Sequence, residues 1–416
     1  MEGKQMKLKV DKRALSVVLL LFPMIKPVED ALAVIIGNSL AHVLIRVLSV
    51  WDYSSIFICL LLFINGVLKR KFPIQTYTKI IVCFSILCIV STLREFSYNI
   101  LYICRIIGNL WLIILLANIY SGERIKYFLQ GCYLYLTLIS IINSLSIYLF
   151  YPNGMNAVNY YLYGLDNMGF IIAFHGFLLG MICQIIYYDR IKNRFKLLYL
   201  LIFGAYVYSG SGTAIIITIA SVIFILFYDT WLMKGITYKR ALMICILVFV
   251  CITLIPTDGV FTEVSILLGK GSSFNGRTVI WAAMFDILPR HLWTGFGISP
   301  DVTQYYIGLY PSGGWLNSIG HMHNVVFEFL FRGGLIGFVF FCIMWLMSIE
   351  KMEKYNQYLV YRVLCTQLIL SLLTCMFEYR IDTYTFWLVP ICIYNIENLC
   401  EINTKKKFKG IKEEIN

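Results

Sequence analysis

The chain has 416 residues, of which 59% are hydrophobic and only 14% are charged, and its mean hydropathy is +0.76. Soluble domains carry about a quarter charged residues, so a water-soluble protein of this composition would lack the polar surface to cover its core. The apolar residues come in blocks of roughly 16–25, the length that crosses the hydrocarbon layer of a bilayer. These numbers exclude soluble globular, fibrous, disulfide-rich and disordered proteins and predict an all-α polytopic integral membrane protein.

The net charge of +12 comes from 35 Lys and Arg against 23 Asp and Glu. In a soluble protein this excess would suggest nucleic acid binding, but in a membrane protein basic residues gather in cytoplasmic loops and orient the helices. We therefore expect no nucleic acid partner. The 13 cysteines lie almost all inside apolar runs without metal-ligand spacing, so we expect neither a disulfide nor a zinc site.

Between the basic clusters we predict about twelve transmembrane helices with both termini in the cytoplasm. The run 197–228 is too long for one simple crossing, and Ser209–Gly212 is the breaker in its middle, so we expect a hairpin there. Residues 31–50 place polar side chains on one face, which predicts an amphipathic helix at the outer interface or a half-inserted helix. The predicted spans lie near residues 14–26, 53–68, 79–93, 99–119, 127–150, 167–187, 197–209, 212–228, 241–256, 322–347, 363–378 and 383–399.

The predicted organisation has four parts. Residues 1–256 form an N-terminal bundle of about nine spans, 257–321 a large extracytoplasmic loop, 322–400 the C-terminal transmembrane helices and 401–416 a basic cytoplasmic tail. The other loops are mostly short, so a long external segment is where function is expected.

In the middle of this loop, the spacing of apolar residues predicts an amphipathic helix over residues 275–289, which ends at Pro289. Arg277 and Trp281 lie on it, and Arg290 follows it. Guanidinium groups match phosphate oxygens with two parallel donors, and aromatic rings pack against the C–H faces of sugars. The combination suits an anionic, sugar-bearing lipid, although Trp and Arg are also common as anchors at a membrane interface.

The end of the loop carries His321, His323 and Asn324, directly before the next membrane helix. A histidine accepts a hydroxyl proton near neutral pH, so His323 is a candidate general base, although a histidine at a helix mouth is also common as a structural residue. Residues two apart do not face the same way on a regular helix. We therefore expect His323 alone to act as the base, with His321 in support, and we expect His321 and Asn324 to contact the substrate.

The order of these elements resembles the O-antigen ligase and polymerase superfamily over about residues 276–337. The residues that carry the resemblance are Gly276-Arg277, Trp281, Pro289, Gly295-Phe296-Gly297, His323-Asn324, Gly334 and Gly337. The resemblance implies an integral-membrane glycosyltransferase of the GT-C-like type that uses no nucleotide sugar. Its donor would be an oligosaccharide on polyprenyl pyrophosphate. Its acceptor would be a hydroxyl on another lipid-linked unit in polymerases, or on a lipid core in ligases.

The resemblance also assigns roles. His323 matches the family histidine proposed to engage the acceptor hydroxyl, and Arg277 matches the loop arginine, which acts on the pyrophosphate or holds the loop. Two positions depart from the family. The hairpin that usually reads Ser-Arg-Gly is Ser211-Gly212-Thr213 here, and Arg332 stands where a Glu often precedes the final glycines, with Glu328 as the alternative position.

The family hairpin supplies an arginine that this chain lacks, and arginines inside the membrane are candidates to replace it. An ionisable residue inside a membrane is costly and is usually functional or paired. Arg332 and Arg105 both lie within predicted spans, and Arg380 lies near the outer face. The alternative is an ion pair with Glu328 or Glu378, or snorkelling to the interface.

The chain contains no Asp-x-Asp motif, so we expect metal-independent catalysis without a cofactor, in which arginines stabilise the departing pyrophosphate. Glu29 and Asp30 are a reserve pair of catalytic acids, or simply end two helices. The predicted function is a polymerase that joins undecaprenyl-pyrophosphate-linked repeat units into O-antigen or capsule polysaccharide on the outer face of the cytoplasmic membrane. Its partners are membrane lipids and other polysaccharide-assembly proteins. The alternatives are a ligase that transfers glycan to a lipid acceptor, and a flippase for the same lipid-linked sugars.

Overall fold

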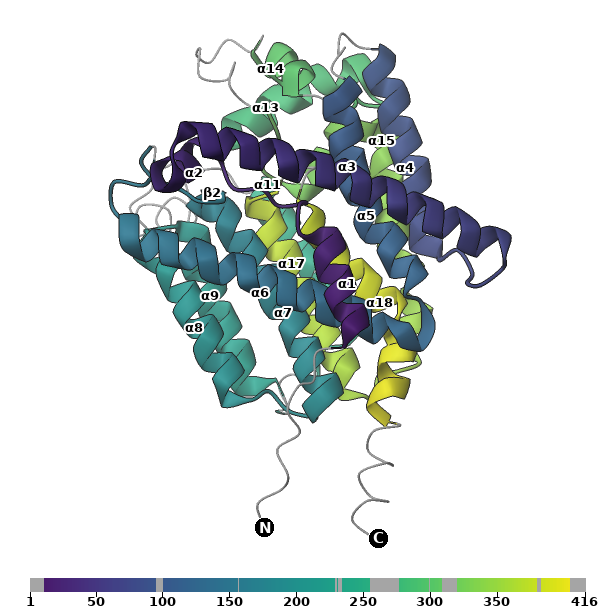
Figure 1. Cartoon of the computed structure of the whole chain (residues 1–416). Helices are drawn as coiled ribbons and strands as arrows, with labels where there is room; N and C mark the ends of the chain where they lie inside the picture. Colours follow the sequence, from purple (N-terminus) through teal and green to yellow (C-terminus); the bar gives the residue numbers. More distant parts are fainter. Residues whose placement is uncertain are drawn as a thin grey trace.

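A computed structural model of the chain (Figure 1) describes residues 11–94, 100–155, 157–228, 230, 234–254, 277–298, 300–308, 320–379 and 383–404. Its described part is mostly helical. Strand structure there is confined to one hairpin, in which β1 (Tyr160–Tyr161) pairs antiparallel with β2 (Gly164–Leu165).

The helices of the first half are α1 (Lys12–Leu21), α2 (Glu29–Ile36), α3 (Asn38–Leu68), α4 (Thr76–Arg94), α5 (Ile100–Ile119), η1 (Gly122–Arg124), α6 (Ile125–Phe150), α7 (Asp166–Tyr188), α8 (Asn193–Tyr208) and α9 (Gly212–Phe227). Those of the second half are α11 (Tyr238–Leu254), α13 (Arg277–Ile287), η2 (Leu288–His291), α14 (Pro300–Gly308), α15 (Val325–Leu346), α16 (Ile349–Glu353), α17 (Leu359–Phe377), η4 (Tyr384–Trp387) and α18 (Leu388–Tyr394).

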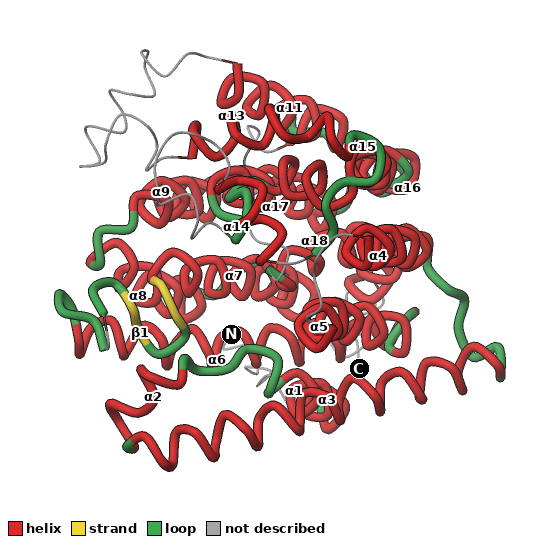
Figure 2. The backbone as a smooth tube through the Cα atoms, turned by 90° about the horizontal axis from the view of Figure 1, so that it is seen from above, coloured by secondary structure: helices red, strands yellow, loops and turns green. Residues whose placement is uncertain are grey.

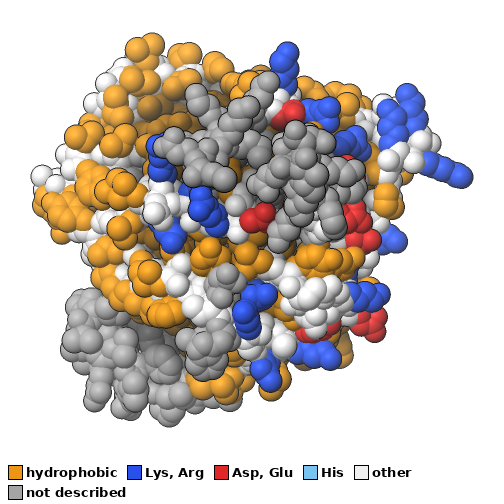
Figure 3. Space-filling view, turned by 90° about the horizontal axis from the view of Figure 1, so that it is seen from below, with side chains coloured by type: hydrophobic (Ala, Val, Ile, Leu, Met, Phe, Trp, Pro, Cys, Tyr) orange, Lys and Arg blue, Asp and Glu red, His pale blue; other side chains and the backbone are white. Residues whose placement is uncertain are grey.

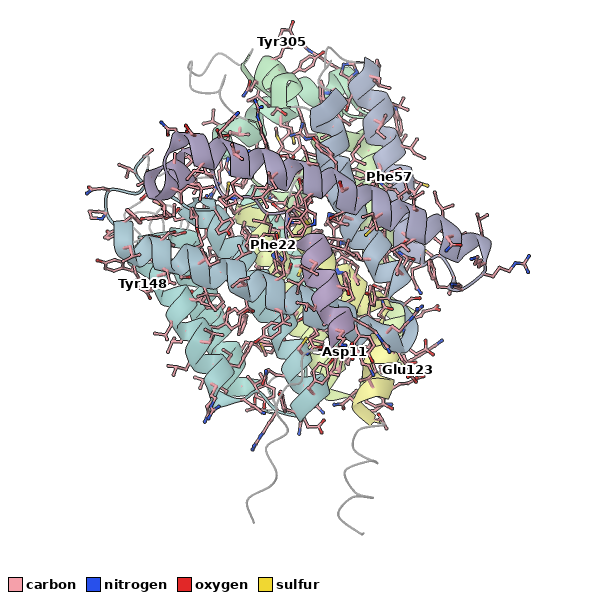
Figure 4. All side chains as sticks on the ribbon, viewed as in Figure 1. Asp11, Phe22, Phe57, Glu123, Tyr148 and Tyr305 are labelled. Carbon is pink, nitrogen blue, oxygen red and sulfur yellow. The ribbon has the colours of Figure 1, made fainter. Side chains whose placement is uncertain are left out.

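Several helices are long and apolar enough to cross a membrane. Among the described residues there are six of them: Asn38–Leu68, Thr76–Arg94, Gly122–Phe150, Asp166–Tyr188, Val325–Glu353 and Leu359–Phe377. The flanks of the bundle are apolar as well, because Phe57 is 59% exposed and Tyr148 is 46% exposed, and both point away from it (Figure 4). The predicted class, a mostly helical multi-span membrane protein, is confirmed. The number twelve remains a prediction.

The long apolar run over residues 197–228 folds back on itself, as its length and its central breaker predict. α8 ends at Tyr208, α9 begins at Gly212, and the two helices lie side by side (Figure 1). Ser211 caps α9, and its side chain accepts a hydrogen bond from the Ala214 N–H.

One element differs from the prediction. From Asn38 onward, the predicted interfacial helix over 31–50 and the separate span after it form a single continuous helix, α3, which lies along one side of the bundle (Figure 2). The chain breaks earlier, at Gly37, whose φ of +82° suits glycine and separates α2 from α3. No Gly or Pro stands between Asn38 and Leu68 except Gly66, so nothing ends the helix near residue 50.

The elements at the two ends of the bundle can be told apart in the figures. α1 begins at the lower end of Figure 1, toward which α18 also points, and Lys and Arg side chains gather on that face (Figure 3). α13 and α14 lie at the opposite end, where Figure 4 labels Tyr305. Basic side chains on the lower face are what the positive-inside rule requires when that end faces the cytoplasm.

The described residues between α11 and α15 (277–298, 300–308 and 320–324) are called the outer segment, after their predicted side of the membrane. This segment is joined to α15 through a break in that helix. Gly334 has φ +61° and ψ −157°, which is non-helical. Around it, the N–H groups of Phe296 and Gly297 donate to the carbonyls of Phe331 and Arg332 at 2.8 and 2.9 Å. A Cβ at Gly295 would lie 2.5 Å from the backbone nitrogen of Gly334. These glycines are therefore needed for close backbone packing.

Candidate functional site

An arginine, a glutamate and a histidine from three different elements meet at the base of the outer segment. Arg277 Nη2 lies 2.6 Å from Glu378 Oε2, and His323 Nδ1 lies 3.1 Å from Glu378 Oε1. The Glu378 side chain is only 3% exposed, whereas Arg277 is 14% exposed and His323 is 20% exposed. The carboxylate is thus buried behind two more accessible cationic or basic groups. We call these three residues the His323 cluster.

The electrostatics of the cluster keep its carboxylate ionised. Burial by itself raises the pKa of the Glu378 carboxyl, but the hydrogen bond with His323 and the charge of Arg277 outweigh it and lower the pKa below its ordinary value of 4.5. A hydrogen bond from the side chain of Asn167, at the start of α7, acts in the same direction. Glu378 is therefore a fixed negative charge near neutral pH.

This charge orients the imidazole. A carboxylate only accepts hydrogen bonds, so the 3.1 Å contact makes His323 Nδ1 the protonated nitrogen. The lone pair of the neutral ring then lies on Nε2, which can take a proton from a substrate hydroxyl.

The backbone at His323 is strained, with φ +56°, in the left-handed region that non-glycine residues rarely adopt. Both backbone polar groups of the preceding residue, Met322, are hydrogen-bonded. The Met322 N–H donates to Glu328 Oε2 at 2.8 Å, and the Met322 carbonyl accepts from Trp281 Nε1 at 2.9 Å. These contacts fix the direction in which the His323 side chain points.

Asn324 secures the other side of the histidine. Its Oδ1 accepts from the N–H groups of Val326 and Phe327 at 2.9 and 3.3 Å, so it is the N-cap of α15. Its Nδ2 donates to the Met376 carbonyl at 3.0 Å, which ties α15 to the end of α17 next to Glu378. Asn324 is fully buried. Its contacts, like those of Trp281, favour a positioning role over the substrate-binding role expected from the sequence.

His321 lies directly against His323, with ring centroids 3.9 Å apart. On a regular helix these two residues would face apart. Residues 320–323 are not helical, however, and α15 begins only at Val325. The two imidazoles therefore share one site, which brings His321 closer to the His323 cluster than helical spacing suggests.

Arg332 is enclosed by protein acceptors. Its Nε bonds Glu328 Oε1 at 3.0 Å, and its side chain is 2% exposed against 0% for Glu328. Its Nη1 donates to the Gly297 carbonyl and to Thr303 Oγ1, and its Nη2 donates to the Gly320 carbonyl at 2.8 Å. Of the two roles considered for Arg332, the contacts favour the ion pair with Glu328, which fastens three points of the outer segment to α15.

The other candidate cations are Arg290, Arg105 and Arg380. Arg290 is exposed on η2, and the side chain of Arg105 and all of Arg380 lie outside the described residues. In the reserve pair, Glu29 Oε1 lies 2.8 Å from His42 Nδ1 at the α2–α3 surface.

Glu378 is the central residue that sequence reasoning missed, since it was considered only as a partner for an arginine. Its signal was present, because a carboxylate directly after an apolar span is unusual. Asp166 was also missed. It accepts a hydrogen bond from Ser209 Oγ at 3.0 Å and so joins the α8–α9 hairpin to the start of α7.

The cluster also offers possible metal ligands. One ligand atom from each of His321, His323 and Glu378 lies within 4.8 Å of the others. Both carboxylate oxygens of Glu378 are engaged, however, one by Arg277 and one by His323. An ion would have to compete with the guanidinium for that carboxylate.

Comparison with known proteins gives one family. A family model described as O-antigen ligase matches residues 197–342, from α8 to within α15. The match contains the α8–α9 hairpin, Arg277 and His323, and it ends before Glu378. No curated protein matches the chain. The resemblance predicted from the motifs is confirmed.

Proposed function

We propose that the chain is a member of the superfamily of O-antigen polymerases and ligases, whose family model matches residues 197–342, and that it is a polymerase of lipid-linked oligosaccharide repeat units. Members of the family are glycosyltransferase-like enzymes, and the family implies a lipid-linked oligosaccharide substrate and a membrane setting. The observation that carries the proposal is the His323 cluster, which joins a base, its orienting carboxylate and an arginine.

In the proposed reaction an acceptor sugar hydroxyl attacks the anomeric carbon of the donor glycan. The new bond joins the acceptor oxygen to that carbon, and the bond from the carbon to the pyrophosphate oxygen breaks. His323 Nε2 takes the hydroxyl proton, and the polyprenyl pyrophosphate leaves with the bonding electron pair. Such a base contributes on the order of 10²–10⁴ in rate.

Arg277 is the proposed contact for the departing pyrophosphate, because its guanidinium is partly exposed beside His323. Arg290 is a second candidate on the same outer segment. Arg332 acts indirectly in this scheme, by holding the segment that carries the catalytic residues.

We propose that the reaction needs no metal ion. The chain has no Asp-x-Asp motif, and Glu378 already has a permanent cation in Arg277. Transition-state charge would then be stabilised by fixed guanidinium groups, which need no reorganisation during the reaction.

The setting that we propose is the cytoplasmic membrane, with twelve spans in the GT-C-like manner, residues 257–321 outside and both termini inside. Undecaprenyl pyrophosphate is the proposed carrier, and O-antigen or capsule polysaccharide the proposed product, made together with other assembly proteins. The basic face at the lower end of the bundle supports this orientation (Figure 3).

The test uses purified protein in vesicles, lipid-linked repeat units and no nucleotide sugar. A polymerase produces a ladder of longer lipid-linked glycans. A ligase produces a ladder-free product only when a lipid-core acceptor is added. Unchanged substrate that has crossed the vesicle membrane would instead identify a flippase and remove the proposal.

A further inference from the structure

A cavity of about 350 Å³ lies beside the His323 cluster. Its walls come from the α1–α2 connection, the β1–β2 hairpin, the first turns of α7 and residues 378–379 and 383–385. Part of this wall is fixed by the Val28 N–H, which donates to the Leu162 carbonyl of the hairpin at 2.8 Å. The volume falls in the range of about 300–1,000 Å³ that is usual for small-molecule sites.

Glu378 belongs both to the cavity wall and to the cluster. Its carboxylate oxygens bond Arg277 and His323, and the residue also lines the cavity. A molecule in the cavity therefore lies next to the groups assigned to the reaction.

The polar lining is rich in hydroxyl groups and aromatic rings. Tyr160, Tyr163 and Tyr384 contribute both, and Thr383 adds a further hydroxyl. Burial raises the pKa of Tyr163 to about 12, so its phenol stays protonated and can donate near neutral pH. Rings that pack on C–H faces, with hydroxyls at their edges, are the chemistry that binds a sugar.

The charges of the lining are compensated within the protein. Lys26 Nζ lies 2.9 Å from Asp52 Oδ2 and donates to Ser49 Oγ at 3.2 Å, and its side chain is 6% exposed. Because this lysine already has a carboxylate partner, the described residues of the lining offer no free cation of the kind that a pyrophosphate requires. It fits the glycan better than the phosphate part of a lipid-linked sugar.

We propose that this cavity is a saccharide subsite, which binds the acceptor sugar whose hydroxyl His323 activates. The inference rests on the proposed transferase function, because the subsite would hold the acceptor substrate of that reaction. The donor is oriented by its pyrophosphate on the exposed arginines, and the acceptor is oriented by its ring in the cavity.

The test fills the cavity and measures glycan binding apart from catalysis. The probe is the repeat-unit oligosaccharide released by mild acid from the cell's own lipid-linked units, with binding followed by saturation-transfer NMR. Ile172 lines the cavity from α7, so Ile172→Trp should weaken binding about tenfold or more and raise the acceptor KM as much, with kcat within about twofold. The matched control is Ile219→Trp on α9, where the isoleucine is 57% exposed. This variant should change neither the glycan affinity nor the acceptor KM.

A second variant keeps the proposal testable if the bulky substitution fails to fold. Tyr163→Phe removes a single hydroxyl and should weaken binding about 2- to 10-fold. Wild-type protein that binds no free glycan would overturn the subsite, as would two folded variants with wild-type affinity and KM. Glycan binding that is lost in both variants, in a protein that forms no ladder, would support the subsite and refute the polymerase.

Discussion

Two arginine–glutamate pairs lie on either side of the same histidine segment, and they differ in what surrounds them. In the pair of Arg332 with Glu328, the side chains are 2% and 0% exposed, and the guanidinium is bonded to protein acceptors at all three nitrogens. In the pair of Arg277 with Glu378, the arginine is 14% exposed, and the carboxylate also holds an imidazole. The closed pair holds the segment in place, and the open pair is arranged to meet a substrate.

The proposed difference between the two pairs is tested most directly by replacing the histidine that the open pair holds. His323→Ala should reduce the rate of ladder formation on the order of 10²–10⁴, because the proposed base is lost. Folding should be unchanged, since the side chain is partly exposed and its neighbours are held by other contacts. The measurement is the initial rate with purified protein of wild-type size-exclusion profile. Full activity in this variant would remove the base assignment.

The closed pair predicts the largest loss of stability. Arg332→Met leaves Glu328 as an uncompensated buried charge and should cost about 3–5 kcal/mol, read as a large fall in Tm in detergent. The matched variant Arg277→Met should lower the Tm less, because the side chains of His323 and Asn167 still hydrogen-bond Glu378, while abolishing ladder formation. Equal losses of Tm in the two variants would show that the closed pair is no more important for stability than the open pair.

Replacing the carboxylate of the open pair should give a smaller effect. Glu378→Gln keeps the side-chain shape but no longer favours the Nδ1–H tautomer, so the rate should fall about 10- to 100-fold. The pKa of Glu378 is lowered in the folded protein, so its stabilisation is complete above the ordinary carboxyl value of 4.5 and is lost as the pH falls through the lowered value. The wild-type Tm should therefore decline more steeply than that of Glu378→Gln below about pH 4.5. Parallel Tm curves would contradict this.

The hydrogen bond from Trp281 to the Met322 carbonyl lies between the two pairs, and its removal should have a modest effect. Trp281→Phe leaves the Met322 carbonyl without its donor and should cost about 1–3 kcal/mol, with a lower rate because His323 is held less firmly. Trp293→Phe is the control, because that ring is 66% exposed, and its change should stay within about 0.5 kcal/mol. A larger loss in the control than in Trp281→Phe would mean that the Met322 contact does not position the site.

The smallest expected effect comes from metal removal. Incubation with EDTA should leave the ladder unchanged, because Arg277 already neutralises the carboxylate that an ion would need. Loss of activity that is restored by a divalent cation would instead assign His321, His323 and Glu378 as its ligands.

The sequence was sufficient for the class of protein, the α8–α9 hairpin and the residues at the family motif positions. Composition and periodicity decide the first two, because both are local properties of the chain. The motif residues follow from their order alone. In contrast, Glu378 stands 55 residues after His323 in the chain, and only the packing of α17 against α15 brings the two together.

Local rules also failed where tertiary contacts override them. The spacing of His321 and His323 would set their rings apart on a helix, but the bonds to Met322 and the cap by Asn324 keep the segment non-helical. The sequence left two roles open for Arg332, a free intramembrane cation or the partner of a glutamate. It could not decide between them, because two of the acceptors are backbone carbonyls, which no sequence pattern reveals.

The break of α15 at Gly334 bears on how such proteins can be recombined. The Leu335 and Ile336 N–H groups donate to the carbonyls of Leu292 and Trp293, so the outer segment completes the hydrogen bonding of a membrane helix. In a bilayer each unsatisfied backbone group costs several kcal/mol. A chimaera that exchanges residues 292–297 without the facing part of α15 would misalign these bonds, so the two stretches form one module that must be transplanted together.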